Sequence, residues 1–279
     1  PVLMTDVVAD AIDSIKHWRG TSRQYIGASG IGNVCNAYLA FCLRGYPDNE
    51  VAPQLSRIFR EGHRIEDQIV GDLRKAGFTV YDVDPSTRKQ WEYLDHGRHV
   101  IGHADGQIEL DDRFEGCRRG EVALLEIKSM NDASFRKFEG KGVKVSHPQY
   151  FGQVQLMMGL SNIHKSLFVC YNKNNSKYAS ELVDFDDIFY SSQRARIQIV
   201  MTNEATKIAA DETDWRCKGR AGQCFKFDVC WGDKKPELYC SSCQYAEANE
   251  EDIWFCNKHG HAARELCSDY KVYHPKPKP

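Results

Sequence analysis

The sequence predicts a mixed α/β protein, in which helices flank a central β-sheet and a cysteine-rich, metal-binding region follows. Three observations predict this fold class. Residues 55–77 carry apolar side chains at helical spacing, residues 99–110 and 121–130 are apolar segments typical of strands, and seven of eleven cysteines lie between Cys217 and Cys267. Clustered cysteines without a secretion signal indicate metal ligation before disulfides, which remain the alternative.

The composition is that of an ordinary globular protein. At 279 residues, with 42% hydrophobic and 27% charged residues, the chain can bury one large core or two smaller ones. No apolar run approaches the roughly 18 residues that a membrane span needs, so we expect an intracellular, cytoplasmic protein without membrane contact. The net charge of −2 neither indicates nor excludes a nucleic-acid partner.

The first half of the chain is expected to supply two helices and most of a sheet. A helix over residues 29–44 opens with Ser29 as its N-cap and carries Cys35. A second helix over residues 55–77 stops at Gly77. Three further segments, and a short strand near Trp91, are expected to form one sheet: 78–84, 99–110 and 121–130.

The second half continues the α/β pattern. Residues 131–149 are polar and basic with two glycines, which indicates a loop, and a helix over 148–160 has Pro148 near its start. Strands are expected at 165–173 and 178–185, and a long polar helix at about 186–210. The last residues, 275–279, are expected to be a disordered tail.

Glu126 and Lys128 are charged residues inside an apolar predicted strand. Side chains alternate along a strand, so these two share a face while Ile127 points to the other. Burying them without partners costs roughly several kcal/mol. Asp105 lies in the preceding predicted strand, and its carboxylate would repel that of Glu126 unless a cation lay between them. Oxygen ligands suit Mg²⁺ or Mn²⁺, and Lys128 would then polarise a water molecule or hold a phosphate.

The order Asp105, then Glu126-Ile127-Lys128 on the next strand, then a helix with Gln153, resembles the PD-(D/E)XK nuclease superfamily. The chain is most similar to the branch that contains RecB-type nuclease domains, lambda exonuclease and the CRISPR-adaptation nucleases, although Ala104 replaces the proline of the motif. The resemblance implies a restriction-endonuclease-like core and a divalent-metal-dependent deoxyribonuclease. It favours an exonuclease of recombination, repair or phage DNA processing, encoded by a phage or prophage and working in a bacterial host cell.

The resemblance also implies a role for each matching residue. A metal ion would be held by His63, Asp105, Glu126 and the carbonyl of Ile127, with Lys128 and Gln153 completing the catalytic set. Met157 stands where the family's helix has a tyrosine. The simpler alternatives are a surface histidine at position 63 and an intrastrand ion pair between Glu126 and Lys128, which leaves Asp105 unexplained.

Positive charge follows the apolar strand. Four residues are candidates to contact DNA phosphates, with His147 beside them: Arg136, Lys137, Lys141 and Lys144. The alternative is a solvated loop. A second Glu-x-Lys, Glu139 and Lys141, is discarded as a catalytic pair because it lies in this glycine-containing stretch. Little sequence specificity is expected.

The cysteines form two sets. RecB-like nucleases with an iron-sulfur cluster carry one cysteine before the core and three after it, which implies a 4Fe-4S cluster or zinc at Cys35, Cys217, Cys224 and Cys230. The second set has a typical zinc spacing: Cys240-x-x-Cys243, then Cys256, with Cys267 or His259 as fourth ligand. Free buried thiols are the alternative, and the Cys-x-x-Cys lacks the surroundings of a redox motif.

We therefore expect a nuclease core over 25–210, a cysteine segment over 211–235 that closes a metal site with Cys35, and a zinc-binding module over 236–274. The competing hypothesis is a non-catalytic DNA-binding or recombination-partner subunit that retains the nuclease fold. DNA is the expected partner in both cases, with a recombination or helicase protein as a further partner.

Overall fold

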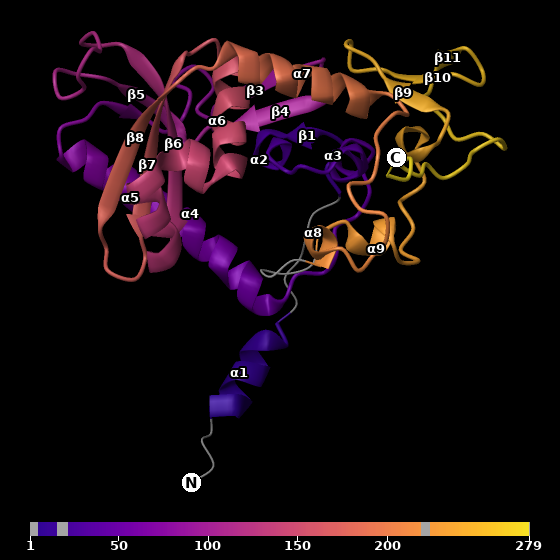
Figure 1. Cartoon of the computed structure of the whole chain (residues 1–279), viewed down its shortest axis with the longest axis horizontal. Helices are drawn as coiled ribbons and strands as arrows, with labels where there is room; N and C mark the ends of the chain where they lie inside the picture. Colours follow the sequence, from indigo (N-terminus) through magenta and orange to yellow (C-terminus); the bar gives the residue numbers. More distant parts are fainter. Residues whose placement is uncertain (1–4, 16–21, 219–223, 279) are drawn as a thin grey trace.

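A five-stranded mixed sheet lies at one end of the computed structural model, which describes residues 5–15, 22–218 and 224–278 (Figure 1). Its strand order is β2-β5-β6-β7-β8, and β6 and β7 are parallel while the other neighbours are antiparallel. The strands are β2 (Val80–Tyr81), β5 (Gly106–Glu109), β6 (Val122–Met130), β7 (Lys165–Asn172) and β8 (Tyr178–Asp184). The predicted mixed α/β class is confirmed.

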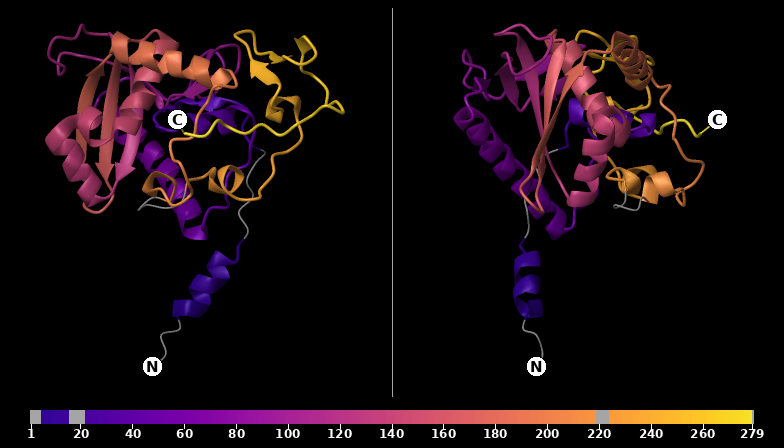
Figure 2. Two further views of the ribbon diagram at one scale, coloured as in Figure 1. Left: turned by 45° about the vertical axis from the view of Figure 1, so that its right-hand side comes forward. Right: turned by 60° about the vertical axis from the view of Figure 1, so that its left-hand side comes forward.

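Helices cover both faces of this sheet (Figure 2). On one face α4 (Pro53–Lys75) packs Ile65 and Ile69 against Ile127 of β6. On the other face α5 (Asp132–Ser146) and α6 (Pro148–Ser161) form a second core with Leu124 of β6. The alternation along β6 therefore places Ile127 on the α4 side and its even-numbered neighbours on the α5 and α6 side.

The strands that the sequence predicts in a single sheet are divided between two sheets. The order of the second sheet is β1-β4-β3, with β1 (Ile26–Gly27), β3 (Glu92–Asp95) and β4 (Val100–His103). The prediction of one strand over 99–110 is wrong, because the chain changes sheets at Asp105. The backbone N–H of Ala104 donates to Trp91 O beside β3, whereas Gly106 pairs with Leu125 of β6.

The predicted helix over 29–44 is also divided. It forms α2 (Ala28–Ile31) and α3 (Asn36–Leu43), with Cys35 at the N-cap of α3. Between the two helices the chain passes close to the backbone of α6: a Cβ atom on Gly32 would lie 2.4 Å from Gln149 O, so glycine is required there.

Two further boundaries differ from the predictions. The basic stretch expected as a loop is α5, which contains Glu139 and Lys141 and is kinked at Gly142. The helix expected to reach about residue 210 is α7 (Asp187–Met201), which ends at an extended Thr202. The helices at 55–77 and 148–160 are confirmed as α4 and α6, and the strands near 165 and 178 as β7 and β8.

The C-terminal region consists of short elements packed beside α3 and α7 (Figure 1). They are α8 (Trp215–Lys218), α9 (Phe227–Cys230), the 3-10 turn η1 (Cys240–Ser242), β9 (Ala246–Ala248), β10 (Trp254–Cys256) and β11 (His261–Ala262). The tail expected to be disordered is hydrogen-bonded to the body at least as far as Lys276. The Lys276 N–H donates to Ala205 O, and the Lys276 carbonyl accepts from the N–H of Lys207. Residues 219–223 and 279 lie outside the described part of the chain.

At the other end, α1 (Thr5–Asp13) projects away from the body (Figure 1). Asp13 accepts a hydrogen bond from Arg57 of α4 at 2.6 Å. Within the described ranges, none of the helices combines the length and apolar character needed to cross a bilayer.

Candidate functional site

The register between β5 and β6 brings Asp105 to Glu126. Gly106 lies opposite Leu125, so one step further along the antiparallel pair Asp105 faces Glu126. Asp105 Oδ2 accepts a 2.7 Å hydrogen bond from the backbone N–H of Ile127. This bond holds the carboxylate at the point where the chain leaves one sheet for the other.

Glu126 and Lys128 are in contact on the α5 and α6 side of the sheet. The Glu126 side chain is only 4% exposed and its Oε1 forms an ion pair with Lys128 Nζ. The same Nζ lies 3.2 Å from Ile127 O, to which it donates. Apart from this ion pair, Glu126 Oε1 accepts no hydrogen bond of normal geometry from the described residues.

The electrostatics of the pair follow from burial and from a third charge. Burial raises the pKa of the Glu126 carboxyl; the Lys128 ammonium opposes this, and the nearby Asp105 charge adds to it. For Lys128, burial favours the neutral amine, but the carboxylates of Glu126 and Asp105 outweigh it and raise the pKa. Lys128 therefore stays charged at neutral pH, and its ammonium is the one positive charge that acts on both the buried Glu126 and the half-buried Asp105 in these interactions.

Tyr150, rather than Gln153, is the α6 residue next to Lys128. Its ring centroid lies 5.6 Å from Lys128 Nζ, and it stacks on His147 at 5.5 Å. The sequence contained a signal for it, since Tyr150 precedes Gln153 by one helical turn on the same face. Gln153 is buried and lines a cavity of about 180 Å³ with His103 of β4.

His63 lies on α4, which covers the opposite face of the sheet from Glu126 and Lys128. Its side chain is 82% exposed and its Nδ1 lies 3.1 Å from Glu66 Oε2. Among the described residues it makes no hydrogen bond or ion pair with Asp105 or Glu126. Glu66 is half-buried, and its charge contributes to raising the pKa of Glu126, after burial and the closer Asp105.

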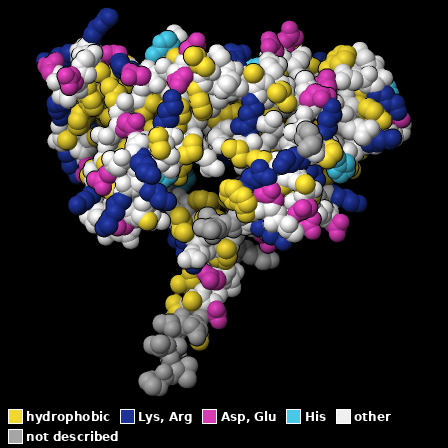
Figure 3. Space-filling model, in the orientation of Figure 1, with side chains coloured by type: hydrophobic (Ala, Val, Ile, Leu, Met, Phe, Trp, Pro, Cys, Tyr) yellow, Lys and Arg dark blue, Asp and Glu magenta, His cyan; other side chains and the backbone are white. Residues whose placement is uncertain are grey.

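The four candidate DNA contacts all lie on α5, and two of them have partners within the protein. Arg136 pairs with Asp132 at 3.0 Å, and Lys144 pairs with Asp186 at 3.0 Å. Lys137 and Lys141 are exposed. Figure 3 shows Lys and Arg side chains interspersed with Asp and Glu over this face of the molecule, so it carries no single positive field.

The first cysteine set converges on one cavity of about 590 Å³, which lies between α3, α8 and α9 and is lined by all four of its members. Burial raises the pKa of the Cys224 thiol to about 11 and that of Cys230 to about 12, and the neighbouring cysteines of the set contribute to both. The backbone N–H of Cys224 donates to Cys217 O at 2.8 Å, which ties two of them together.

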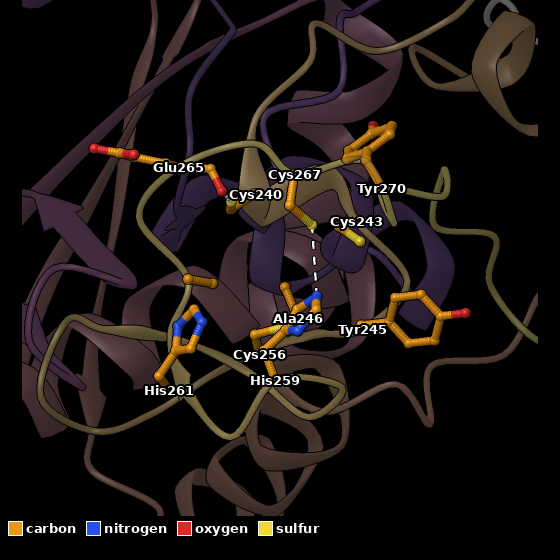
Figure 4. Close-up of a pocket in the computed structure, with 11 residues that line it drawn as sticks. Cys240, Cys243, Tyr245, Ala246, Cys256, His259, His261, Glu265, Cys267 and Tyr270 are labelled. Atoms are coloured by element: carbon orange, nitrogen blue, oxygen red, sulfur yellow. Dashed lines mark hydrogen bonds between the residues drawn. The ribbon is translucent and has the colours of Figure 1, made fainter.

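The second set lines a smaller cavity with His259 (Figure 4). All eleven cysteines are free thiols, so the structure holds no disulfide. In the residues that the structure describes, no three His, Cys, Asp or Glu side chains are arranged so that they would hold a metal ion as they stand. Each thiol set is thus gathered around a cavity but is not in a ligand geometry.

Comparisons with known proteins give weak likenesses only. No family model and no curated protein matches the chain. A crystal structure of an alkaline exonuclease, LHK-Exo from Laribacter hongkongensis, superposes with a TM-score of 0.45 at 18% identity, covering 64% of this chain and 87% of that one. The structure of SSO0001 gives 0.44 at 14%, covering 81% and 93%.

A third solved structure, a phage related exonuclease from Haemophilus somnus 129PT, gives a TM-score of 0.40 at 14% identity, covering 62% of this chain and 78% of that one. TM-scores below 0.5 assign neither family nor activity. What this chain does must therefore be argued from its own side chains.

Proposed function

We propose that this protein is a divalent-metal-dependent DNA nuclease that hydrolyses phosphodiester bonds. One observation carries the proposal: the β5–β6 register places Asp105 opposite Glu126, with Asp105 Oδ2 bonded to the next N–H, and Lys128 pairs with Glu126 on that face of the sheet. Two acids of this kind can hold a metal ion that activates water and stabilises charge on a phosphate, and an amine beside them can orient that water.

The donor atoms present fit a divalent cation. Glu126 Oε1 is buried without a normal hydrogen bond, and Lys128 Nζ already contacts both Glu126 Oε1 and Ile127 O. The ammonium thus marks a place that favours positive charge. Asp105, Glu126 and Ile127 O would hold Mg²⁺ or Mn²⁺, whose oxygen preference matches this set. Bound there, the ion would supply Lewis acidity to water and to a phosphate oxygen.

The chain's own groups then have separate roles. The Ile127 N–H orients Asp105, and Lys128, displaced from Glu126, orients the attacking water and stabilises it as hydroxide. The water loses one proton to solvent, and its oxygen bonds to phosphorus as the P–O3′ bond breaks; the leaving 3′-oxygen takes up a proton from solvent, which leaves a 5′-phosphate and a 3′-hydroxyl. We further propose that the enzyme attacks DNA ends, as an exonuclease, and that Gln153, which lines a cavity with His103, completes the catalytic set.

The exposed lysines of α5 are proposed to contact DNA backbone. Lys137 and Lys141 are better candidates than Arg136 and Lys144, whose charges are already paired. Such contacts recognise phosphate and not base sequence. Replacing Lys137 with Ala is expected to weaken binding equally on unrelated sequences and to flatten the dependence of the affinity on salt. An unchanged salt slope would exclude this contact.

The first cysteine set is proposed to hold a 4Fe-4S cluster or zinc. Four thiols from segments far apart in the sequence surround one cavity, which is the donor set that either group needs. It would join the α3 region to the segment after α7. Anaerobic purification followed by iron, sulfide and zinc analysis of wild type and Cys224→Ser distinguishes the two groups: the variant should lose iron and sulfide if the set holds a cluster, or one zinc per chain if it holds zinc.

Cleavage of linear, circular and single-stranded DNA, with Mg²⁺, Mn²⁺ or chelator, tests the nuclease proposal. We expect Asp105→Asn, Glu126→Gln and Lys128→Met each to lose activity by about 10²-fold or more. Two exposed residues provide matched controls, Glu139→Gln and Lys177→Met, which should retain wild-type rates. Cleavage that survives in all three site variants would reject the site. Metal-independent DNA binding without cleavage would favour the non-catalytic alternative.

A further inference from the structure

Arg44, which follows α3, is a cation with no exposed surface. Its Nη1 donates to Ser241 O at 2.9 Å and Cys243 O at 3.0 Å, and its Nη2 donates to Ala246 O at 2.8 Å. The guanidinium also lies 3.8 Å from the centroid of the Tyr273 ring. One side chain of the α/β body therefore holds the turn around Cys240 and Cys243.

No carboxylate of the described chain lies within ion-pair distance of Arg44, and the buried Nε has no hydrogen-bond acceptor. The charge of Glu247 acts on Arg44 at longer range, through Asn203, which accepts a hydrogen bond from Nη2 and donates one to Glu247 Oε1. The effective cost of burying a charged guanidinium is several kcal/mol. Main-chain carbonyls and this more distant carboxylate relieve part of that cost. A negative group near this turn would complete the arrangement.

Four thiols are gathered beside the same turn. The strand register supplies part of the reason, because Cys256 of β10 pairs with Ala246 of β9, three residues after Cys243. Figure 4 shows the sulfurs of Cys243 and Cys267 turned toward a common space, next to His259. Cys267 Sγ lies 3.7 Å from His259 Nε2. The cavity between these side chains measures about 130 Å³, which is ample for a single ion.

The module around this cavity has little core of its own. Its strands contain three, three and two residues. Apart from Tyr273, which packs against Arg44, the buried apolar side chains near the turn are small, Cys243 and Ala246, while large ones such as Phe255 and Leu266 are exposed. A region that buries so little apolar surface needs another source of stability.

We propose that Cys240, Cys243, Cys256 and Cys267 bind one Zn²⁺, and that the buried Arg44 guanidinium partly neutralises this thiolate centre and fixes it to α3. Four thiolates around Zn²⁺ carry a net double negative charge, of which Arg44 balances one unit. Binding requires side-chain movement, because the Cys240 thiol as placed donates to Glu265 O at 2.9 Å. The released protons go to solvent.

Zinc content of the full chain tests the ligand set. Protein from zinc-supplemented medium is analysed for metal as wild type and as Cys256→Ser and Cys267→Ser. Cys117→Ser is the matched control, because Cys117 packs against a different core, the one between α4 and the sheet. We expect each ligand variant to lose one zinc per chain relative to the control. Equal zinc in Cys256→Ser and Cys117→Ser would overturn the proposal.

Cobalt substitution tests for a thiolate site in the wild type, without any variant. In variants of each set it shows which cysteines bind the metal. Co²⁺ bound by four thiolates gives intense sulfur-to-cobalt charge-transfer bands, which must persist in Cys224→Ser and in His259→Gln. Their absence in the wild-type protein would reject a thiolate site. Bands retained in Cys267→Ser but lost in His259→Gln would show that His259, and not Cys267, is the fourth ligand.

The role of Arg44 is tested by zinc affinity. Removal of a group that supports metal ligands without binding the metal typically lowers affinity about 10- to 100-fold, and we expect this for Arg44→Met. Arg44→Lys, which keeps the charge, should recover part of the affinity. Arg64→Met on the exposed side of α4 is the control and should bind zinc like wild type. An unchanged affinity in Arg44→Met would reject the charge-balance role.

Discussion

At the scale of single residues, the proposed catalytic centre is defined by how three charges compensate one another. Glu126 is nearly inaccessible to solvent, and Lys128, the cation that pairs with it, also donates a hydrogen bond to Ile127 O. Asp105 adds a second negative charge from the neighbouring strand and is oriented by a backbone N–H. One ammonium between two carboxylates leaves the group short of positive charge, which is the electrostatic basis for metal binding.

Tyr150 provides a test at this scale, because its ring limits where the Lys128 ammonium can lie. If Lys128 orients the attacking water, Tyr150→Ala should lower the cleavage rate about tenfold, whereas Tyr150→Phe, which keeps the ring face, should stay within about twofold of wild type. Single-turnover cleavage at saturating DNA measures both. Equal rates for Ala and wild type would show that the ring does not position Lys128.

At the scale of secondary structure, the α5 helix is shaped by one glycine. Gly142 has φ +66° and ψ 170° between two helical pieces. The following N–H, that of Val143, donates to Glu181 Oε2 of β8 at 2.6 Å. The kink lets a strand carboxylate cap the second piece of the helix, and it turns the chain toward Pro148 at the start of α6.

Gly142→Ala is therefore expected to lower the free energy of unfolding by about 1–3 kcal/mol. A Cβ atom there would meet both Glu181 carboxylate oxygens at 3.0 Å, in a backbone conformation that alanine rarely adopts. Gly140→Ala, two residues earlier, is the control: nothing lies within 4 Å of its Cβ position, so it should stabilise α5 by about 0.5–1 kcal/mol. Urea unfolding measures both, and the same sign for the two variants would contradict this account.

At the scale of the whole molecule, the C-terminal module is attached to the α/β body through buried side chains from both parts. Arg44 bonds the carbonyls of the Cys240–Cys243 turn, and the Tyr46 hydroxyl donates to Tyr273 O at 2.6 Å. His99, just before β4, packs its ring against Trp254 at 5.4 Å with near-perpendicular planes. Contacts of this kind couple the stability of the module to that of the body.

His99 makes this coupling depend on pH. Burial lowers its pKa below the usual value, and Asp252, 3.9 Å away, only partly opposes this. The unfolded chain therefore binds the proton more readily, so the stability due to neutral His99 is present above the unfolded pKa and is lost as pH falls through the folded one. His99→Phe removes this contribution.

Wild-type protein should thus lose more unfolding free energy than His99→Phe between pH 7 and pH 5, by about 1.4 kcal/mol for each unit of difference in the His99 pKa. Thermal and urea unfolding across this range provide the comparison. Parallel curves for the two proteins would mean that His99 titrates normally in the folded state.

The sequence by itself determined which residues share a face. Alternation along residues 121–130 predicted Glu126 and Lys128 on one side and Ile127 on the other, as found, and helical spacing gave α4 and α6 nearly to their ends. The structure also gathers the second cysteine set around one cavity. Such patterns are local, because strand and helix periods act over a few neighbouring residues.

Only the tertiary structure decided which distant segments meet. The change of sheets at Asp105, the close approach of Gly32 to the backbone of α6, and the place of Arg44 against the Cys240–Cys243 turn depend on contacts between residues that are far apart in the sequence. The physical reason is that burial and hydrogen bonding between remote segments override local preference. The sequence around an arginine that follows a helix does not indicate which distant carbonyl groups its side chain will bind.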